Sequence, residues 1–157
     1  MATDVRIREL QLADIPSIAN LLHDLALEFI TPEFDANARR EFLEKNSQSA
    51  IENFISDGFR YHVAETREGP IGFVGVRDNK HLSHLFVAKP FHRQGLGRRL
   101  WETAMSECRA AGNPGNFTVN SSNNAVAVYE NFGFVRSAPT QNSGGVFFNP
   151  MTLQTNA

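Results

Sequence analysis

The chain has 157 residues, of which 41% are hydrophobic and 20% are charged, and its formal net charge is −2 at pH 7. This length fits one compact domain that buries its core without metals or disulfides, so we expect a single domain over 1–157. The single cysteine excludes an internal disulfide and any multi-cysteine metal site. The slightly acidic balance argues against a general nucleic-acid binder. Because neither a membrane-length apolar run nor a signal-peptide pattern is present, we expect a cytoplasmic protein with no metal, membrane or nucleic-acid partner.

The spacing of apolar residues predicts a mixture of strands and helices. Seven segments carry the alternation or the short apolar run typical of strands: 4–10, 59–66, 71–77, 81–87, 117–120, 134–137 and 146–153. Helical spacing covers four other segments: 15–29, 35–56, 95–111 and a short stretch after 121–124. Asp14 is the expected N-cap of the first helix, and the pair Asn46 and Ser47 is expected to divide the second.

The connections between these segments define the expected sheet. Residues 68–70 have the composition of a tight turn, so the strands beside them form an antiparallel hairpin. The strand at 117–120 follows a helix and should therefore run parallel to the strand at 81–87. A last hairpin surrounds the polar loop 140–145. The sequence thus predicts an α/β (α+β) domain with a central, mixed, mostly antiparallel sheet of about seven strands flanked by helices.

The most informative stretch is 85–101, where an apolar strand leads into a glycine-punctuated basic loop and then into an amphipathic helix. The free N–H groups and the dipole of a helix N-terminus attract anions, and Gly95 and Gly97 let a diphosphate approach the backbone. A P-loop would need Gly-Lys-Ser/Thr, whereas Arg98 follows Gly97 here. A dinucleotide-binding turn would want a third glycine near position 100, where Leu100 stands. The stretch therefore predicts a phosphate-binding turn of a different kind.

Two motifs follow one another along the chain. The first has the pattern Arg/Gln-x-x-Gly-x-Gly/Ala and falls on 92–97, with His92 in place of the usual first residue. The second has the pattern Ala-x-x-x-Tyr-x-x-x-Gly-Phe and is complete, at Ala125, Tyr129, Gly133 and Phe134. Together they resemble the GNAT superfamily of acyl-CoA-dependent N-acetyltransferases, and the resemblance covers almost the whole chain. It implies the GNAT fold, in which the fourth and fifth strands splay apart, and acetyl-CoA as co-substrate.

The resemblance also implies which residues bind acetyl-CoA. The pantetheine arm would bond to the main chain of the strand before the loop, and the loop would hold the diphosphate. Arginines there could neutralise phosphates, because the guanidinium group matches phosphate geometry. A further polar contact would come from Ser122 or from Asn124, and the sequence leaves both open. The other implied residues are Leu85, Phe86, Val87, Arg93, Gln94, Gly95, Leu96, Gly97 and Arg98.

Tyr129 occupies the family's position for the general acid, which would protonate the departing thiolate. A phenol can donate at neutral pH because its ordinary pKa is about 10. A primary amine is only about a thousandth neutral at pH 7, so a base or a water relay is expected to help. His81 and His84 are candidates; being three apart on a strand, they should face opposite sides and not share a metal. His81 lies six residues before Val87, where several GNAT enzymes place a base, and is preferred.

Two function classes fit these motifs. The first is an N-acetyltransferase that moves an acetyl group from acetyl-CoA to a small amine or a protein amino group by direct attack in a ternary complex. The second is a non-catalytic acyl-CoA-binding module, and Tyr129 and His81 favour the enzyme. In the family the first two helices and the last hairpin form the acceptor site, and the acidic excess over 21–45 gives a mild preference for a cationic amine. The apolar strand at 146–148 is either the edge of a homodimer or an ordinary core strand.

Overall fold

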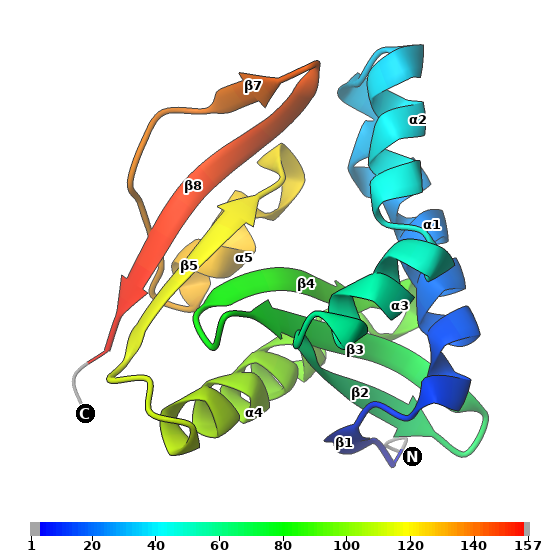
Figure 1. Ribbon diagram of the computed structural model, residues 1–157, viewed down its shortest axis with the longest axis vertical. Coiled ribbons are helices and arrows are strands. Elements are labelled where there is room, and N and C mark those ends of the chain that lie inside the picture. The colour runs from blue at the N-terminus through cyan, green and yellow to red at the C-terminus, as the bar shows by residue number, and fades with distance from the viewer. Residues whose placement is uncertain (1–3, 156–157) are drawn as a thin grey trace.

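The computed structural model describes residues 4–155, which form an eight-stranded sheet flanked by helices (Figure 1). The strands are β1 (Arg6–Glu9), β2 (Arg60–Thr66), β3 (Gly69–Arg77), β4 (His81–Val87), β5 (Asn116–Ser121), β6 (Val135–Arg136), β7 (Gln141–Ser143) and β8 (Val146–Gln154). The α-helices are α1 (Ile15–Phe29), α2 (Ala36–Lys45), α3 (Gln48–Ser56), α4 (Leu96–Ala110) and α5 (Val126–Asn131). Short 3-10 turns are η1 (Leu12–Asp14), η2 (Thr31–Glu33), η3 (Lys89–Phe91) and η4 (Asn123–Ala125). No helix within these residues is long and apolar enough to cross a membrane.

The sheet has the order β1-β2-β3-β4-β5-β8-β6, and β7 also pairs with β8. The pairing of β4 with β5 is parallel and the other pairings are antiparallel, so the predicted mixed sheet is confirmed. The eighth strand, β7, lies in the segment expected to be a loop. Its exposed residues Gln141, Asn142 and Ser143 carry no apolar alternation, and only pairing with β8 makes them a strand. The turn before β3 consists of Arg67 and Glu68, because Thr66 pairs with Gly69.

Two hydrophobic clusters cover the two faces of the sheet. One lies under α4 and includes the buried side chains Leu100, Trp101 and Phe117. The other lies under α1 and α3 and is built around Ile18 and Phe73. Each such side chain contributes roughly 1.5–3 kcal/mol by leaving water. These two layers hold β4 and β5, the strands that border the site described below.

The N-terminus of α1 differs from its expected form. Asp14 stands at the N-cap of α1, but its carboxylate makes no capping hydrogen bond there. It accepts hydrogen bonds from the main-chain N–H of Gln11 (2.8 Å) and from the guanidinium of Arg8 (2.8 and 2.9 Å). The Arg8 guanidinium lowers the pKa of Asp14. Asp14 therefore joins α1 to β1 instead of capping the helix, a role set by an ion pair that local spacing does not reveal.

A β-bulge interrupts β4 and changes which face its side chains occupy. In its pairing with β3, Gly75 opposes His84 and Val76 opposes Leu82, so Ser83 is an extra residue. Side chains alternate along a regular strand, and the extra residue returns His84 to the face that His81 occupies. The expectation that the two histidines face opposite sides is therefore wrong. Both lie on the face covered by α1 and α3.

Gly75 is required by a close contact inside this bulged region. A Cβ atom added there would clash with the ring carbons of Tyr61. We expect Gly75→Ala to lower the free energy of unfolding by about 2 kcal/mol, because the displaced ring disturbs a packed core. Urea unfolding measures this change. The loss should shrink when the substitution is made in a Tyr61→Leu background; an equal loss in both backgrounds would assign the cost to the backbone instead.

Candidate functional site

The site begins where β4 and β5 separate. The two strands pair at His81 with Thr118 and at Leu82 with Val119. Beyond Leu82 the described residues show no further β4–β5 pairing, and β5 continues along β8 (Figure 1). The separation begins at the bulge, because a bulge bends its strand and ends regular pairing. Residues 83–87 thus present an open strand edge, which can form main-chain hydrogen bonds with an extended ligand.

A cavity of about 910 Å³ occupies this separation. This volume lies near the upper end of the range for sites that bind small molecules. The walls come from the ends of α1 and α2, from β4, from the loop and first turn of α4, from β5 to α5, and from β8. The lining residues are Leu25, Phe29, Ile30, Phe42, Asn46, 83–87, Phe91, His92, Arg93, 95–98, Asn120, Ser122, Asn124, Ala125, Val128, Tyr129, Asn131, Phe132 and 146–148.

The N-terminus of α4 lies at one end of the cavity, where its geometry can accommodate an anion. Gly95 is the N-cap residue of α4, with φ +78°, and as a glycine it has no side chain to cap the helix. A Cβ atom added at this position would have no neighbour within 4 Å. The helix N–H groups are therefore open to an approaching anion. Two arginines add positive charge. Arg98 donates from Nη2 to the Asn131 carbonyl oxygen (2.9 Å) and lies 5.1 Å from the centre of the Phe132 ring, whereas Arg93 stands in the loop itself with φ +64°.

His92 connects the loop to the strand before it. Its Nε2 lies 2.6 Å from the carbonyl oxygen of Val87, so this nitrogen carries the proton and donates. The imidazole ring also lies 5.9 Å from the ring of Phe29 at the end of α1. The side chain that departs from the loop motif thus holds the loop against the end of β4.

Tyr129 brings a phenol to the opposite wall. The residue is only 7% exposed, and its ring packs edge-on against Phe132 and Phe134. Its hydroxyl has no hydrogen-bond partner among residues 4–155. Burial raises the pKa of Tyr129, so the phenol stays protonated throughout the neutral range. The cavity wall therefore carries a proton donor that is not hydrogen-bonded to any other described residue.

His84 lies at the wall of the cavity within a chain of three hydrogen-bonded side chains. The Asn46 amide nitrogen donates to the Phe42 carbonyl (2.9 Å), which directs Asn46 Oδ1 towards His84 Nε2 (2.8 Å). His84 Nε2 must then donate, and His84 Nδ1 accepts from the Tyr61 hydroxyl at 2.8 Å. Burial lowers the pKa of His84 to about 4. The imidazole is therefore neutral, and both of its nitrogens are already engaged.

The fold and this site match a known family. The family model for the acetyltransferase (GNAT) domain matches residues 30–155. The chain belongs to the GNAT acetyltransferase family. No curated protein matches it in sequence.

Solved structures with little sequence identity share the fold of this GNAT domain. A GCN5-related N-acetyltransferase (aminotransferase, class II) from Rhodopseudomonas palustris is 19% identical, with a TM-score of 0.78 over 100% of this chain and 99% of its own. PaiA from Thermoplasma acidophilum, in complex with coenzyme A, is 18% identical, with a TM-score of 0.77 over 97% and 99%. YncA from Salmonella typhimurium, with its cofactor acetyl-CoA, is 19% identical, with a TM-score of 0.66 over 98% and 94%.

The GNAT domain brings nearly all of the predicted cofactor-binding residues to the cavity. They are Leu85, Phe86, Val87, Arg93, Gly95, Leu96, Gly97, Arg98, Ser122 and Asn124. Ser122 and Asn124 both reach the cavity, so the choice between them stays open. Gln94 does not line it; its amide nitrogen donates to the Pro90 carbonyl oxygen (3.3 Å) on the exposed side of the loop. Gly95 and its neighbours therefore face the ligand space while Gln94 turns away.

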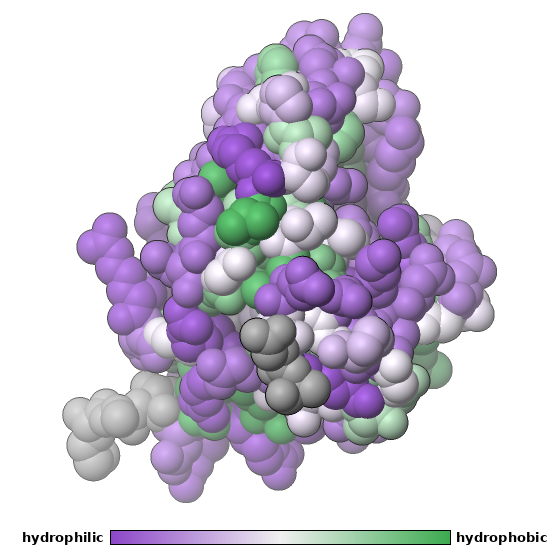
Figure 2. Space-filling view, turned by 90° about the vertical axis from the view of Figure 1, so that its left-hand side faces the viewer, coloured by the Kyte–Doolittle hydropathy of each residue, from purple (hydrophilic) through white to green (hydrophobic). Residues whose placement is uncertain are grey.

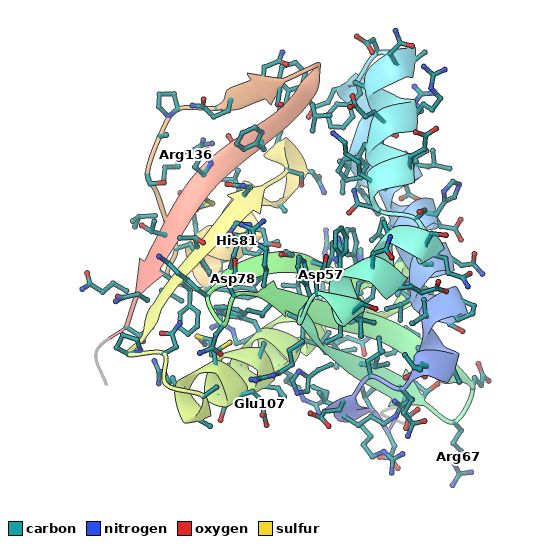
Figure 3. All side chains as sticks on the ribbon, viewed as in Figure 1. Asp57, Arg67, Asp78, His81, Glu107 and Arg136 are labelled. Atoms are coloured by element: carbon teal, nitrogen blue, oxygen red, sulfur yellow. The ribbon has the colours of Figure 1, made fainter. Side chains whose placement is uncertain are left out.

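His81 does not reach the cavity. It lies beside β5 (Figure 3), where its Nδ1 is 2.7 Å from Thr118 Oγ1. Burial lowers the pKa of His81 to about 4. The geometry thus separates His81 from Tyr129, and of the two candidate histidines only His84 lines the cavity. Within residues 4–155 no three His, Cys, Asp or Glu side chains gather as a metal site.

The last strand contributes wall residues whose place the sequence left open. Residues 146–148 line the cavity, and the Phe147 ring lies 6.2 Å from that of Phe34. This apolar stretch therefore belongs to the site. Figure 2 views the molecule from the side of β8 and shows a mostly hydrophilic face with a small group of apolar residues. Asn46 is a further wall residue that sequence reasoning missed, because no local pattern links the end of α2 to β4.

Acid should destabilise the protein through His84. The unfolded imidazole takes up a proton near pH 6.5, whereas the folded one resists protonation until about pH 4. The free energy of unfolding should therefore be insensitive to His84 above pH 6.5 and fall by up to about 3 kcal/mol as the pH drops towards 4. Urea titrations at several pH values measure this slope. His84→Gln should have a shallower slope; an unchanged slope would assign the acid sensitivity to other groups.

Proposed function

We propose that this protein is an acetyl-CoA-dependent N-acetyltransferase that transfers the acetyl group directly to an amine in a ternary complex. One observation carries the proposal: the N-terminus of α4, the unpaired edge of β4 and Tyr129 line a single cavity. Family membership and the fold shared with PaiA and YncA support it. A binding module would need the first two features but has no use for the third.

The residues present fit acetyl-CoA. The N–H groups at the start of α4, with Arg93 and Arg98 beside them, provide the charge and geometry that a diphosphate requires. The main chain of 83–87 can hold an amide-containing arm as an added strand would be held. Ser122 and Asn124 offer polar side chains on the facing wall. When bound, acetyl-CoA supplies an acetyl group activated as a thioester.

The chain's own groups then have separate tasks. A fixed main-chain N–H of β4 is suited to stabilise the negative charge that develops on the acetyl oxygen. The hydroxyl of Tyr129 holds the proton that the leaving thiolate requires, and burial keeps it protonated.

The base predicted from the sequence, His81, is tested by the pH dependence of kcat. A kinetic pKa in the histidine range that persists in His81→Ala removes this residue from the reaction.

The proposal is tested by incubating the protein with acetyl-CoA and a panel of amines and measuring released thiol. We expect acetyl-CoA to raise the melting temperature and at least one amine to release thiol at a rate proportional to protein. A rise in melting temperature without turnover of any amine would instead identify a non-catalytic acyl-CoA-binding module. Absence of both effects would contradict the cofactor site itself.

Arg98 and Arg99 provide a matched pair for the phosphate site. Arg98 lines the cavity, whereas Arg99 donates from Nη2 to the Val5 carbonyl oxygen (3.3 Å) outside it. We expect Arg98→Ala to raise the Kd of coenzyme A by about tenfold, the loss of one charge-assisted contact. Arg99→Ala should change it by less than about twofold. Calorimetric titration measures both, and equal effects would indicate only a general loss of positive charge.

A further inference from the structure

The cavity has a second end, on the face of the sheet opposite α4. Leu85 and Val87 pack with the cluster under α4, whereas Phe86 packs with the cluster under α1 and α3. His84 lies 6.2 Å from the Phe86 ring and shares its face. We call this end the acceptor lobe; its walls are Leu25, Phe29, Phe42, Asn46, His84 and Phe147. The inference below concerns this lobe and rests on the proposed function.

No carboxylate from residues 4–155 lines the acceptor lobe. Four of the six acidic residues over 21–45 have partners outside it. Glu28 pairs with Lys89 (2.8 Å), Glu33 accepts from the Asn123 side chain (2.9 Å), and Asp35 caps α2 through the Ala38 N–H (2.8 Å). Glu41 pairs with Lys45 at 3.0 Å. The cationic acceptor favoured by the acidic composition therefore has no counter-charge in the lobe, and an ammonium group would lose its hydration there with no carboxylate to compensate.

The acceptor lobe also has no free base. His84 is the one imidazole among its six wall residues, and it donates from Nε2 to Asn46 while accepting at Nδ1 from Tyr61. His92, the other histidine of the cavity, belongs to the loop before α4 and donates from Nε2 to the Val87 carbonyl oxygen. Asn46 is itself held by the Phe42 carbonyl. An amine that arrives protonated would have to shed that proton before attack, and none of the six described wall residues of the lobe has a free base to accept it. An amine that arrives neutral does not meet this barrier.

The acceptor lobe is enclosed on the side of α2. The tip of the β7–β8 hairpin lies against α2 (Figure 1), and a Cβ at Gly145 would be 3.0 Å from that of Ala38. The Phe34 ring bridges to Phe147 on β8 (6.2 Å) and to Phe42 on α2 (5.9 Å). These contacts leave room for a small molecule between aromatic walls and restrict entry of a folded protein surface.

We propose that the acceptor is a small aromatic amine whose nitrogen is uncharged at neutral pH. Phenylalanine rings favour offset or edge contacts with another ring, and the lobe supplies several. The protons balance without a base. The amine nitrogen forms the new bond to the acetyl carbon, the carbon–sulfur bond breaks, and the nitrogen loses one proton while the thiolate gains one. Tyr129 lines the same cavity, and its hydroxyl can carry that exchange.

Two isomeric amines test this directly. Para-ethylaniline and phenethylamine have the same atoms and one ring each, but only phenethylamine is protonated at pH 7. We expect kcat/KM for para-ethylaniline to exceed that for phenethylamine by at least about tenfold at pH 7, because only about a thousandth of the aliphatic amine is neutral. The phenethylamine rate should rise about tenfold per pH unit between 7 and 9, whereas the para-ethylaniline rate stays flat. Spermidine or a lysine peptide as best substrate, or a flat phenethylamine profile, would overturn the proposal.

A charge placed in the acceptor lobe should reverse the preference. We expect Phe42→Glu to shift the ratio of the two kcat/KM values at least about tenfold towards phenethylamine, because it supplies the missing counter-charge. The KM for acetyl-CoA should stay within about twofold, since Phe42 lies away from the α4 anion site. The control is Leu12→Glu, at a side chain that is 73% exposed outside the cavity; an equal shift there would contradict the lobe assignment. If Phe42→Glu does not fold, the comparison of the two isomeric amines on the unmodified protein tests the proposal.

Binding separates failure of this inference from failure of the proposed function. If no amine releases thiol, the transferase assignment fails. The acceptor lobe is then judged by calorimetric titration of each isomer into the protein saturated with coenzyme A. Tighter binding of para-ethylaniline at pH 7 supports the lobe's selectivity for neutral aromatic amines, and equal or weaker binding overturns it.

Discussion

Replacing Tyr129 by phenylalanine is expected to lower kcat by about a hundredfold, the smaller end of the range for loss of a positioned acid. The substitution removes only the hydroxyl, which has no hydrogen-bond partner among the described residues, so the ring contacts with Phe132 and Phe134 remain. The melting temperature and the Kd of coenzyme A should therefore change little. Steady-state kinetics with saturating acetyl-CoA measure the effect.

A matched control for this prediction is Tyr61→Phe. Tyr61 is also buried, but its hydroxyl donates to His84 and the residue does not line the cavity. Its loss should reduce stability by about 1 kcal/mol while kcat falls far less than in Tyr129→Phe. If Tyr129→Phe retains the full kcat with an intact fold, the acid role is wrong. The thiolate would then leave without a proton from this side chain.

Replacing Asn149 by alanine is expected to lower the free energy of unfolding by about 3 kcal/mol, because it strands several buried polar groups. The amide is fully buried and uses all of its hydrogen-bonding capacity. Its nitrogen donates to the Ser121 carbonyl oxygen (3.1 Å) and to Asn123 Oδ1 (2.8 Å), and its oxygen accepts from Arg136 Nη1 and Thr140 Oγ1 (2.7 Å each). The residue thus fixes the segment that carries Ser122 to the cavity wall.

The same substitution should raise the KM for acetyl-CoA, since the wall at 121–124 loosens. Chemical unfolding and steady-state kinetics measure the two effects together. Asn53→Ala, on the exposed side of α3, is the control and should shift stability by no more than about 0.5 kcal/mol. A loss of stability with an unchanged KM would limit Asn149 to packing.

Local patterns in the sequence were sufficient for the parts of the fold that depend on short-range physics. Apolar alternation and helical spacing located β2, β3, β4 and α4, because each periodicity is written within a few neighbouring residues. The glycine loop and the segment from Ala125 to Phe134 predicted the GNAT family, which the family model confirms. The predicted parallel pairing of β4 with β5 is also confirmed, since a helical crossover requires it.

Tertiary structure decided what those patterns could not contain. One extra residue at Ser83 shifted the alternation of β4, so both histidines lie on one face and only His84 lines the cavity. Glu28 in α1 pairs with Lys89 and Glu33 accepts from Asn123, and no carboxylate of the described residues lines the acceptor lobe. Sequence alone therefore predicted most of the elements, the place of the glycine loop before α4, and the family. The chemistry of the cavity was decided by contacts between residues far apart in the chain, because which side chains meet depends on the packed fold.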